Sequence, residues 1–316
     1  MDQSIKEKWR SATGYDRFIA IATAGYLLII SAFMIWHQQF FSPDRFFVFA
    51  LVGAAAAGKI GTFLWDWTPP ILLILGYEYL RGIVPQLITK VHIRAMIYFD
   101  RFLFGNVPTI ALQHAFFNIN RLHWYDYTAV TLYLLHFVVP MLAALLFWVL
   151  DRTLFRMYMA AMVALSYLAF ATYYFFPAMP PWLAAQQGFL PPVAHIMDLV
   201  FAHFAHPISL PTVYQYVGAN LVAAVPSLHA AYPLMTALFF YRKFPKYGAI
   251  AFAYPVAMWF AVMYLGEHYA FDIIVATIYV LGIYALITNW RNVRTRIKNF
   301  ILKIFHRRQR ASQVAN

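Results

Sequence analysis

Long apolar runs are the feature that most constrains what this chain can fold into. A helix of roughly 20 mostly apolar residues crosses the hydrocarbon core of a bilayer. The sequence is 63% hydrophobic and only 11% charged, whereas soluble domains are about half apolar and about a quarter charged. It therefore predicts an all-α polytopic membrane protein. The clearest spans are Phe18–Trp36, Tyr127–Leu150, Leu154–Phe176, Tyr247–Leu265 and Ala270–Thr288.

The number of spans depends on three less regular runs. Pro226–Tyr241 is short, but it has to cross if its neighbours are to keep their sides of the membrane. Phe46–Trp65 contains Lys59, and Pro69–Val84 contains two charged residues. These last two runs either both span or both lie in or on the membrane. The prediction is six to eight transmembrane helices around a six-helix core.

Basic residues predict the orientation. Cytoplasmic loops of membrane proteins carry an excess of Lys and Arg, and residues 291–310 contain eight of them. Both termini are therefore expected to be cytoplasmic. The net charge of +12 reflects this topology and not a nucleic-acid-binding surface. Cations that agree with this orientation are Lys6, Lys8, Arg10, Arg17, Arg152, Arg156, Arg242, Lys243 and Lys246.

Three regions follow from this topology. Residues 1–126 are N-terminal helices plus an outer interfacial segment, 127–290 form a catalytic transmembrane core, and 291–316 are a basic cytoplasmic tail. The tail is read as a topology anchor, with binding to anionic lipids as the alternative. Residues 85–126 are anomalous because they are placed outside the cytoplasm and yet contain several cations.

Two histidine motifs are predicted to meet on the extracytoplasmic face. Pro226-Ser227-Leu228-His229 begins one apolar run, and His268-Tyr-Ala-Phe-Asp272 begins another. The charge-based topology places both starts on the same side of the membrane. A joint site is therefore expected there, although each histidine alone is more often structural.

The residue types in these motifs suit phosphoryl transfer. On a helix, residues i and i+4 share a face, so Asp272 can hold the tautomer of His268 and leave its other nitrogen free to attack. A proline suits the first turn of a helix, so Ser227 and the nearby amides would form an anion site. His229 would act as the general acid. A structural His–Asp pair or two metal ligands remain alternatives.

These motifs resemble those of a known family. Pro226-Ser227-Leu228-His229 and Gly266-Glu-His268-Tyr-Ala-Phe-Asp272 are similar to the two histidine blocks of the type 2 phosphatidic acid phosphatase superfamily. They look most like its inositol phosphorylceramide synthase and sphingomyelin synthase branch. Phe176-Pro-Ala-Met-Pro-Pro-Trp182 and Asp100-Arg-Phe-Leu-Phe-Gly105 support the likeness, which covers roughly residues 100–290.

The resemblance implies a lipid phosphotransferase with a phosphohistidine intermediate. His268 would be the nucleophile, Asp272 its orienting partner and His229 the acid. The expected partners are a phospholipid donor and a lipid alcohol acceptor, with no cofactor and no metal. The oligomeric state cannot be predicted.

The chain departs from the family in its phosphate-binding cations. The superfamily's phosphatases have a Lys and an Arg-Pro in their first block, and a Ser-Arg pair before the second histidine, where this chain has Ala261 and Val262. This departure favours transfer over hydrolysis. Arg101 and Arg121 are candidate substitutes, along with Lys90 and Arg94; the alternative is that they snorkel towards lipid head groups.

Two further charged groups are read as structural. Glu78 and Arg81 can pair at i, i+3, as a structural pair or as wall residues of a lipid cavity.

In the long outer loop of residues 177–225, Pro192–Phe204 has helical spacing and suggests an interfacial or re-entrant helix. Metal binding by His203 and His206 is disfavoured, and the absence of cysteine excludes thiolate sites.

Three functions are thus in competition. The first is a lipid phosphotransferase, the second is a lipid phosphate phosphatase that uses water, and the third is a non-enzymatic transporter or scaffold. A transporter more often shows internal repeats and broken helices, and neither is visible in the sequence. The phosphotransferase is the preferred reading.

Overall fold

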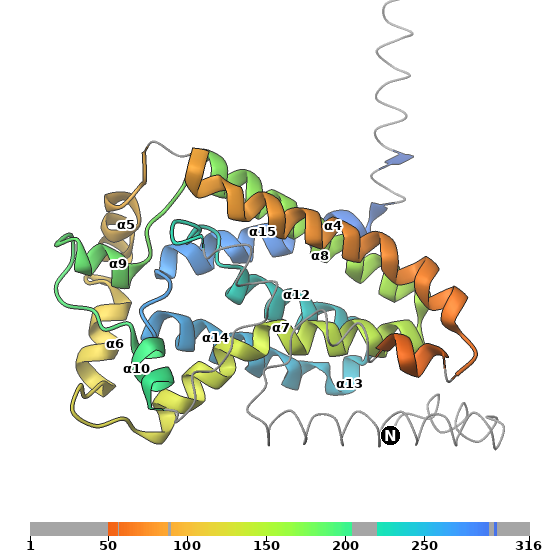
Figure 1. Cartoon of the computed structure of the whole chain (residues 1–316), viewed down its shortest axis with the longest axis horizontal. Helices are drawn as coiled ribbons and strands as arrows, with labels where there is room; N and C mark the ends of the chain where they lie inside the picture. Colours follow the sequence, from red (N-terminus) through yellow and green to blue (C-terminus); the bar gives the residue numbers. More distant parts are fainter. Residues whose placement is uncertain (1–49, 56, 88–89, 204–219, 291–293, 296–316) are drawn as a thin grey trace, which may run out of the picture.

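A computed structural model describes residues 50–55, 57–87, 90–203, 220–290, 294 and 295. The regular elements of these residues are all helices (Figure 1), which confirms the predicted class. The predicted span Phe18–Trp36, the N-terminal cations and nearly all of the basic tail lie outside the described residues. The helices are α4 (Ile60–Leu87), α5 (Arg94–Phe104), α6 (Pro108–Phe116), α7 (Trp124–Leu150), α8 (Arg152–Phe175), α9 (Pro181–Gln186), α10 (Ile196–Ala202), α12 (Leu228–Lys243), α13 (Pro245–Gly248), α14 (Ala253–Tyr264) and α15 (Ala270–Thr288).

Three stretches of the described residues are long and apolar enough to cross a membrane. They are α8, the continuous helical stretch Pro245–Tyr264, and α15, and a fourth is α7 when its bent halves are counted as one span. The central helix α12 has only 16 residues. The described part of the chain thus supplies three or four such spans by length and composition, and the total of six to eight stays a prediction.

Helix α4 corrects the predicted boundaries at the start of the described region. The sequence suggested a break between Phe46–Trp65 and Pro69–Val84, but one 28-residue helix runs through both prolines at positions 69 and 70. The chain turns instead at Gly58, whose φ is +66°. Glycine adopts this left-handed conformation without the steric cost of a Cβ atom.

Helix α7 is bent by 43° between Trp124–His136 and Val138–Leu150. Pro140 lies inside the helix, where it lacks an N–H and its ring clashes with the carbonyl four residues earlier. That carbonyl belongs to His136. The bend thus falls beside a histidine that proves to lie next to the site.

The core is built around α12, which packs against α7, α8, α14 and α15. Ala230, Ala231 and Ala237 of α12 are all buried. Small residues let helix backbones approach closely inside a bilayer, where association depends on packing because lipid is itself apolar. Central placement of α12 is therefore a consequence of its alanines.

The cations of the predicted cytoplasmic loops lie together at one end of the bundle. Lys243 at the end of α12 pairs with Asp151 between α7 and α8, with 2.9 Å between Nζ and Oδ2. Arg152 and Arg156 both pair with Asp66 of α4, at 2.6 and 3.0 Å. Two loops that the charge pattern placed on one side of the membrane thus lie at one end of the structure.

Short helices cover the other end, which we call the site end because α12 and α15 begin there. Helices α5, α6, α9 and α10 lie together at the left of Figure 1. Main-chain bridges join His92 to Ala178 and Ala178 to Ala223, so the segments before α5, α9 and α12 are tied to one another. The predicted helix within Pro192–Phe204 is present as α10, which packs against α7.

Candidate active site

The two histidine motifs meet at the site end. Nε2 of His268 lies 3.3 Å from Nδ1 of His229, and Nδ1 of His268 lies 3.1 Å from Oδ2 of Asp272. A carboxylate can only accept, so the facing Nδ1 carries the proton and Nε2 presents its lone pair. The imidazole is thus oriented with its nucleophilic Nε2 directed at His229, in direct contact with Nδ1.

The contact between His268 and Asp272 arises differently from the prediction. Helix α15 begins at Ala270, with Tyr269 as its N-cap, so His268 precedes the helix and does not share a helical face with Asp272. Instead, Asp272 caps the helix: its Oδ2 accepts a hydrogen bond from the backbone N–H of Tyr269 at 2.9 Å. The same oxygen faces the imidazole, so one buried carboxylate starts the helix and orients the histidine.

The loop that presents His268 is fixed from several sides. Thr109 of α6 donates to the carbonyl of His268 at 3.2 Å, and the N–H of Trp182 in α9 donates to the carbonyl of Gly266 at 3.0 Å. Gly266 has φ +86°, and a Cβ there would lie 3.0 Å from the carbonyl oxygen of Ala194. Both the conformation and the close approach require glycine at this position.

Asp100 of α5 provides a second acidic cap for α15. Its fully buried carboxylate accepts hydrogen bonds from the backbone N–H groups of Ala270 at 3.0 Å and Phe271 at 2.9 Å. Burial raises the pKa of Asp100 to about 6 in spite of these two bonds. A negative charge at a helix N-terminus is favourable, so Asp100 anchors the helix that carries Asp272. It begins one of the two short blocks that supported the family resemblance.

His229 lies in the first turn of α12 between two aromatic side chains of α7. The Tyr133 ring is stacked on it, with centroids 4.1 Å apart, and the His136 ring meets it edge-on at 3.9 Å. His136 is buried, and its Nδ1 lies 2.7 Å from the carbonyl oxygen of Tyr133. Sequence reasoning missed His136, although an ionisable residue inside an apolar run is by itself a signal of function.

Ser227 caps α12 from a buried position. Its Oγ accepts a hydrogen bond from the N–H of Ala230 at 3.2 Å, and its own N–H donates to the carbonyl of Asp272 at 3.3 Å. The side chain is fully buried. Ser227 thus links the starts of α12 and α15. Its hydroxyl is buried and does not face outward as the sequence predicted.

Arg101 and Arg121, the other residues expected to bind phosphate, are exposed. Arg101 lies in the last turn of α5, and Arg121 lies between α6 and α7. Among the described residues, the structure gives neither side chain a hydrogen bond or ion pair with His229 or His268. Arg81 of α4 is a less exposed cation and pairs with Glu78.

His195 closes the outer side of the His268 loop. Its Nε2 lies 2.7 Å from Glu267 and its Nδ1 lies 2.6 Å from Asp198, while its ring is stacked on Trp182 with centroids 4.4 Å apart. Burial opposes protonation of His195, but the hydrogen bonds and charges of Glu267 and Asp198 outweigh it and raise the pKa of His195. A protonated His195 therefore bridges two carboxylates, one of them adjacent to His268.

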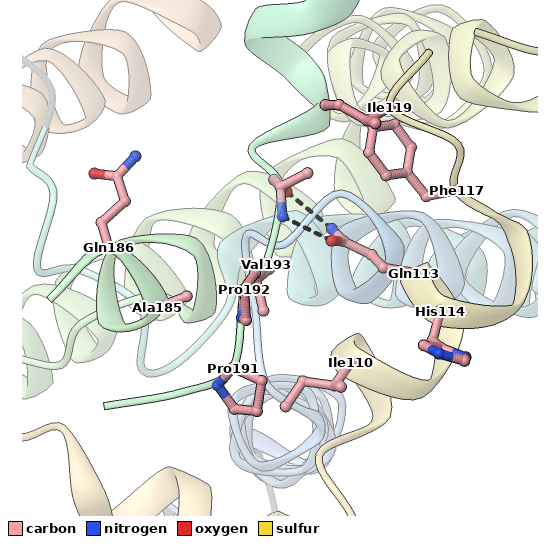
Figure 2. Close-up of a pocket in the computed structure, with 11 residues that line it drawn as sticks. Ile110, Gln113, His114, Phe117, Ile119, Ala185, Gln186, Pro191, Pro192 and Val193 are labelled. Carbon is pink, nitrogen blue, oxygen red and sulfur yellow. Dashed lines mark hydrogen bonds between the residues drawn. The ribbon is translucent and has the colours of Figure 1, made fainter. Parts of the chain in front are cut away.

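A cavity of about 670 Å³ lies beside this loop, between α6, α9 and residues 191–194 (Figure 2). Gln113 reaches from α6 to the far wall, where its amide exchanges hydrogen bonds with both the N–H and the carbonyl of Ala194. The same amide nitrogen donates to the carbonyl of Tyr264 at 2.8 Å. Gln113 thus fixes the end of α14, two residues before Gly266.

The sequence analysis disfavoured metal binding by His203 and His206. No group of three His, Asp or Glu side chains among the described residues is placed to hold a metal ion. His203 follows α10 and is exposed, and His206 lies outside the described residues. Of the acid–base groups at the site end, His268 contacts Asp272 and His229, and His195 contacts Glu267 and Asp198.

Fold and site together define a class: an all-helical membrane protein with a carboxylate-oriented histidine facing a second histidine at one end of the bundle. Residues 94–286 match the PAP2 superfamily, and the chain belongs to that superfamily. The match begins at α5 and includes both histidine motifs.

Three related proteins are similar to parts of this chain. The chain is 26% identical over 226 residues to the phosphoinositol dihydroceramide synthase of Bacteroides thetaiotaomicron, covering 68% of this chain and 72% of the relative. It is 29% identical over 135 residues to the inositol phosphorylceramide synthase catalytic subunit of Saccharomyces cerevisiae, covering 39% and 32%. A third relative is the inositol phosphorylceramide synthase of Candida albicans, 28% identical over 153 residues, covering 45% and 31%. No solved structure matches the chain.

Proposed function

We propose that this protein is a lipid phosphotransferase that moves a phosphoinositol head group from a phospholipid donor to the hydroxyl of a ceramide-type acceptor. The observation that carries the proposal is the arrangement of His268, with Nδ1 at Asp272 and Nε2 facing His229. The three relatives, which are inositol phosphorylceramide and phosphoinositol dihydroceramide synthases, support the choice of head group and acceptor.

The first half-reaction forms a bond between Nε2 of His268 and phosphorus and breaks the bond from phosphorus to the oxygen of the diacylglycerol leaving group. His229 donates a proton to that oxygen as general acid. The imidazole gains positive charge as it attacks, and the carboxylate of Asp272 stabilises this charge through Nδ1. The product is a phosphohistidine in which phosphorus keeps one ester bond to the inositol head group and has one bond to Nε2 of His268.

The second half-reaction transfers the phosphorylated head group from His268 to the acceptor. The hydroxyl of the acceptor attacks phosphorus, His229 removes its proton as general base, and the bond from phosphorus to His268 breaks. Water in place of the lipid alcohol would give hydrolysis. Exclusion of water from the buried site, where Asp272 is fully buried and His268 nearly so, favours the lipid acceptor.

Donor binding has to separate the two histidines. A distance of 3.3 Å between their nitrogens is that of a direct contact, and a phosphorus atom with its oxygens does not fit between them. The phosphoryl group therefore takes the place of this contact, with His268 and His229 on opposite sides of it.

The topology predicted from charge places the site on the extracytoplasmic face. The structure adds that the cations of the predicted cytoplasmic loops gather at the opposite end of the bundle. Accessibility of an introduced cysteine at an exposed position of the site end, such as Asn118, to an impermeant thiol reagent in sealed vesicles tests this orientation. Labelling only from the cytoplasmic side would contradict it.

The activity is tested with protein purified in detergent. Labelled phosphatidylinositol is offered with dihydroceramide, ceramide or diacylglycerol, and the lipid and water-soluble products are separated. We expect label in a new phosphoinositol sphingolipid, whereas water-soluble inositol phosphate alone would show a hydrolase and no product with any acceptor would overturn the proposal.

Substitution of the histidines tests the mechanism. His268→Ala should abolish both transfer and the acid-labile label on the protein, and His229→Ala should slow formation of that label. His114→Ala is the matched control, because His114 lies on α6 with an exposed side chain. Full turnover by His268→Ala with wild-type folding would refute a phosphohistidine at this position.

A further inference from the structure

An ion pair on α4 lies at the site end, on an element outside the residues that match the superfamily. Nε and Nη2 of Arg81 donate to Oε2 of Glu78 at 3.0 and 2.8 Å. The two side chains are only 16% and 20% exposed. Charges at such depth in a membrane protein are costly and mark a functional site by default.

One contact ties the end of α4 to the segment that precedes the first histidine motif. Asn220, which is buried, donates from Nδ2 to the carbonyl of Arg81 at 3.1 Å, so the end of α4 is held against the segment that leads into α12. The charge of Arg81 acts on His229 and on His136. Arg81 is therefore within electrostatic range of the histidine proposed as the acid.

The interface between α8 and the start of α12 is polar. Tyr173 of α8 donates to the carbonyl of Pro226 at 2.9 Å, and the hydroxyl of Tyr232, one turn after His229, pairs with Ser166 at 2.7 Å. Arg81 acts electrostatically on both tyrosines. Hydroxyl groups thus lie at the start of α12 within electrostatic range of Arg81.

The proposed reaction requires such a cation. Negative charge on the phosphoryl oxygens has to be stabilised by fixed donors. Of the basic residues that the family's phosphatases have, the Arg of the Ser-Arg pair is replaced here by Val262, and the Lys and Arg-Pro of the first block are missing. The alternatives Arg101 and Arg121 are exposed. A guanidinium is suited to this role because its planar N–H donors match two phosphate oxygens.

Resting on the proposed function, we infer that Arg81 binds the phosphate of the donor lipid and that Glu78 orients its guanidinium. The contact with Glu78 uses Nε and Nη2 and fixes the plane of the group. In the empty site Glu78 balances the charge of Arg81. In the occupied site the phosphate shares that charge, and the two stay together beside His229.

The test measures phosphate binding separately from turnover. Orthovanadate is the probe, with inhibition of transfer and protection against thermal unfolding as readouts. We expect Arg81→Gln to weaken both effects of vanadate by about 10- to 100-fold, as the loss of a charge-assisted contact implies, and Arg81→Lys to lie in between. Arg242→Gln is the matched control, because Arg242 is exposed in the last turn of α12, at the opposite end from His229.

A purely structural role is tested by replacing both partners. The variant Glu78→Leu/Arg81→Met replaces a half-buried ion pair with apolar residues, a change that often preserves stability. We expect it to fold and melt like the wild type but to remain defective in vanadate binding and transfer. Restored transfer in this variant would show that Arg81 only holds the fold and would overturn the inference.

The outcomes separate this inference from the proposed function. If the wild type transfers the head group and Arg81→Gln keeps wild-type vanadate affinity, the role of Arg81 is refuted and the proposed function stands. If the wild type shows neither transfer nor vanadate binding, the proposed function itself fails.

Discussion

Gln113 should contribute more to stability than any other single polar side chain of the outer segment. Its amide makes three hydrogen bonds, of 2.9, 2.8 and 2.8 Å, to the carbonyl of Ala194, the carbonyl of Tyr264 and the N–H of Ala194 (Figure 2). The side chain is only 7% exposed. In Gln113→Leu the three backbone groups lose their partner while the volume is nearly kept.

The expected loss of stability follows from these hydrogen bonds. Each contributes about 1 kcal/mol net, so Gln113→Leu should lower the free energy of unfolding by about 3 kcal/mol. At roughly 2.1 cal/mol/K of unfolding entropy per residue, 1 kcal/mol corresponds to about 1.5 °C for a chain of 316 residues, so the melting midpoint falls by about 4 to 5 °C. Because Tyr264 lies just before the loop of His268, turnover should fall as well, even well below the midpoint.

The assay is thermal unfolding in detergent, followed by intrinsic fluorescence, together with head-group transfer at a low temperature. Gln186→Leu is the control, because Gln186 lines the same cavity but is exposed, and its side chain points away from Gln113 in Figure 2. A midpoint of Gln113→Leu within 1 °C of the wild type, or an equal drop in Gln186→Leu, would refute the reasoning.

Three further predictions concern other charged residues. Asp100→Ala should slow transfer about tenfold or more, because the N-terminus of α15 loses two acceptors and Asp272 moves with it; unchanged turnover at constant substrate affinity would contradict this. The raised pKa of His195 means that its contribution to stability is fully present below pH 6.5 and is lost as the pH rises through the raised value. Melting midpoints between pH 5 and 9 should show this loss, and Glu267→Gln should move it to lower pH; a midpoint that is independent of pH would exclude it. Asp66→Ala should destabilise the opposite end of the bundle by about 2 to 4 kcal/mol, because Trp148 and two arginines lose their acceptor, while the KM for the donor stays constant.

Much of the fold could be predicted because the bilayer imposes a simple length rule. Helix α15 has the predicted bounds, and α8 differs from them by two residues at its start and one at its end. The start of α4 could not be predicted, because Pro69 and Pro70 are strong signals of a helix end and nothing local indicates that packing against α8 overrides them.

The site was predictable where its residues are close in sequence. His268 and Asp272 were paired from their spacing, and charge alone placed His229 at the same face. The supporting residues are far away in the chain: Asp100 is 170 residues from Ala270 and Asn220 is 139 from Arg81. No local pattern encodes such contacts, so Arg81 was read as structural and the exposed Arg101 was preferred.

The bridges between His92, Ala178 and Ala223 have a consequence for how this enzyme family can vary. Their hydrogen bonds run from the backbone N–H groups of His92, Ala178, Met179 and Ala224 to backbone carbonyls. Main-chain atoms are common to all residues, so these positions constrain size and exclude proline, which lacks the N–H, but they do not demand a particular side chain. These backbone bridges between the outer segment and the start of α12 can therefore be kept while the side chains along them change. Lipid-facing surfaces can then vary among relatives without moving the catalytic residues.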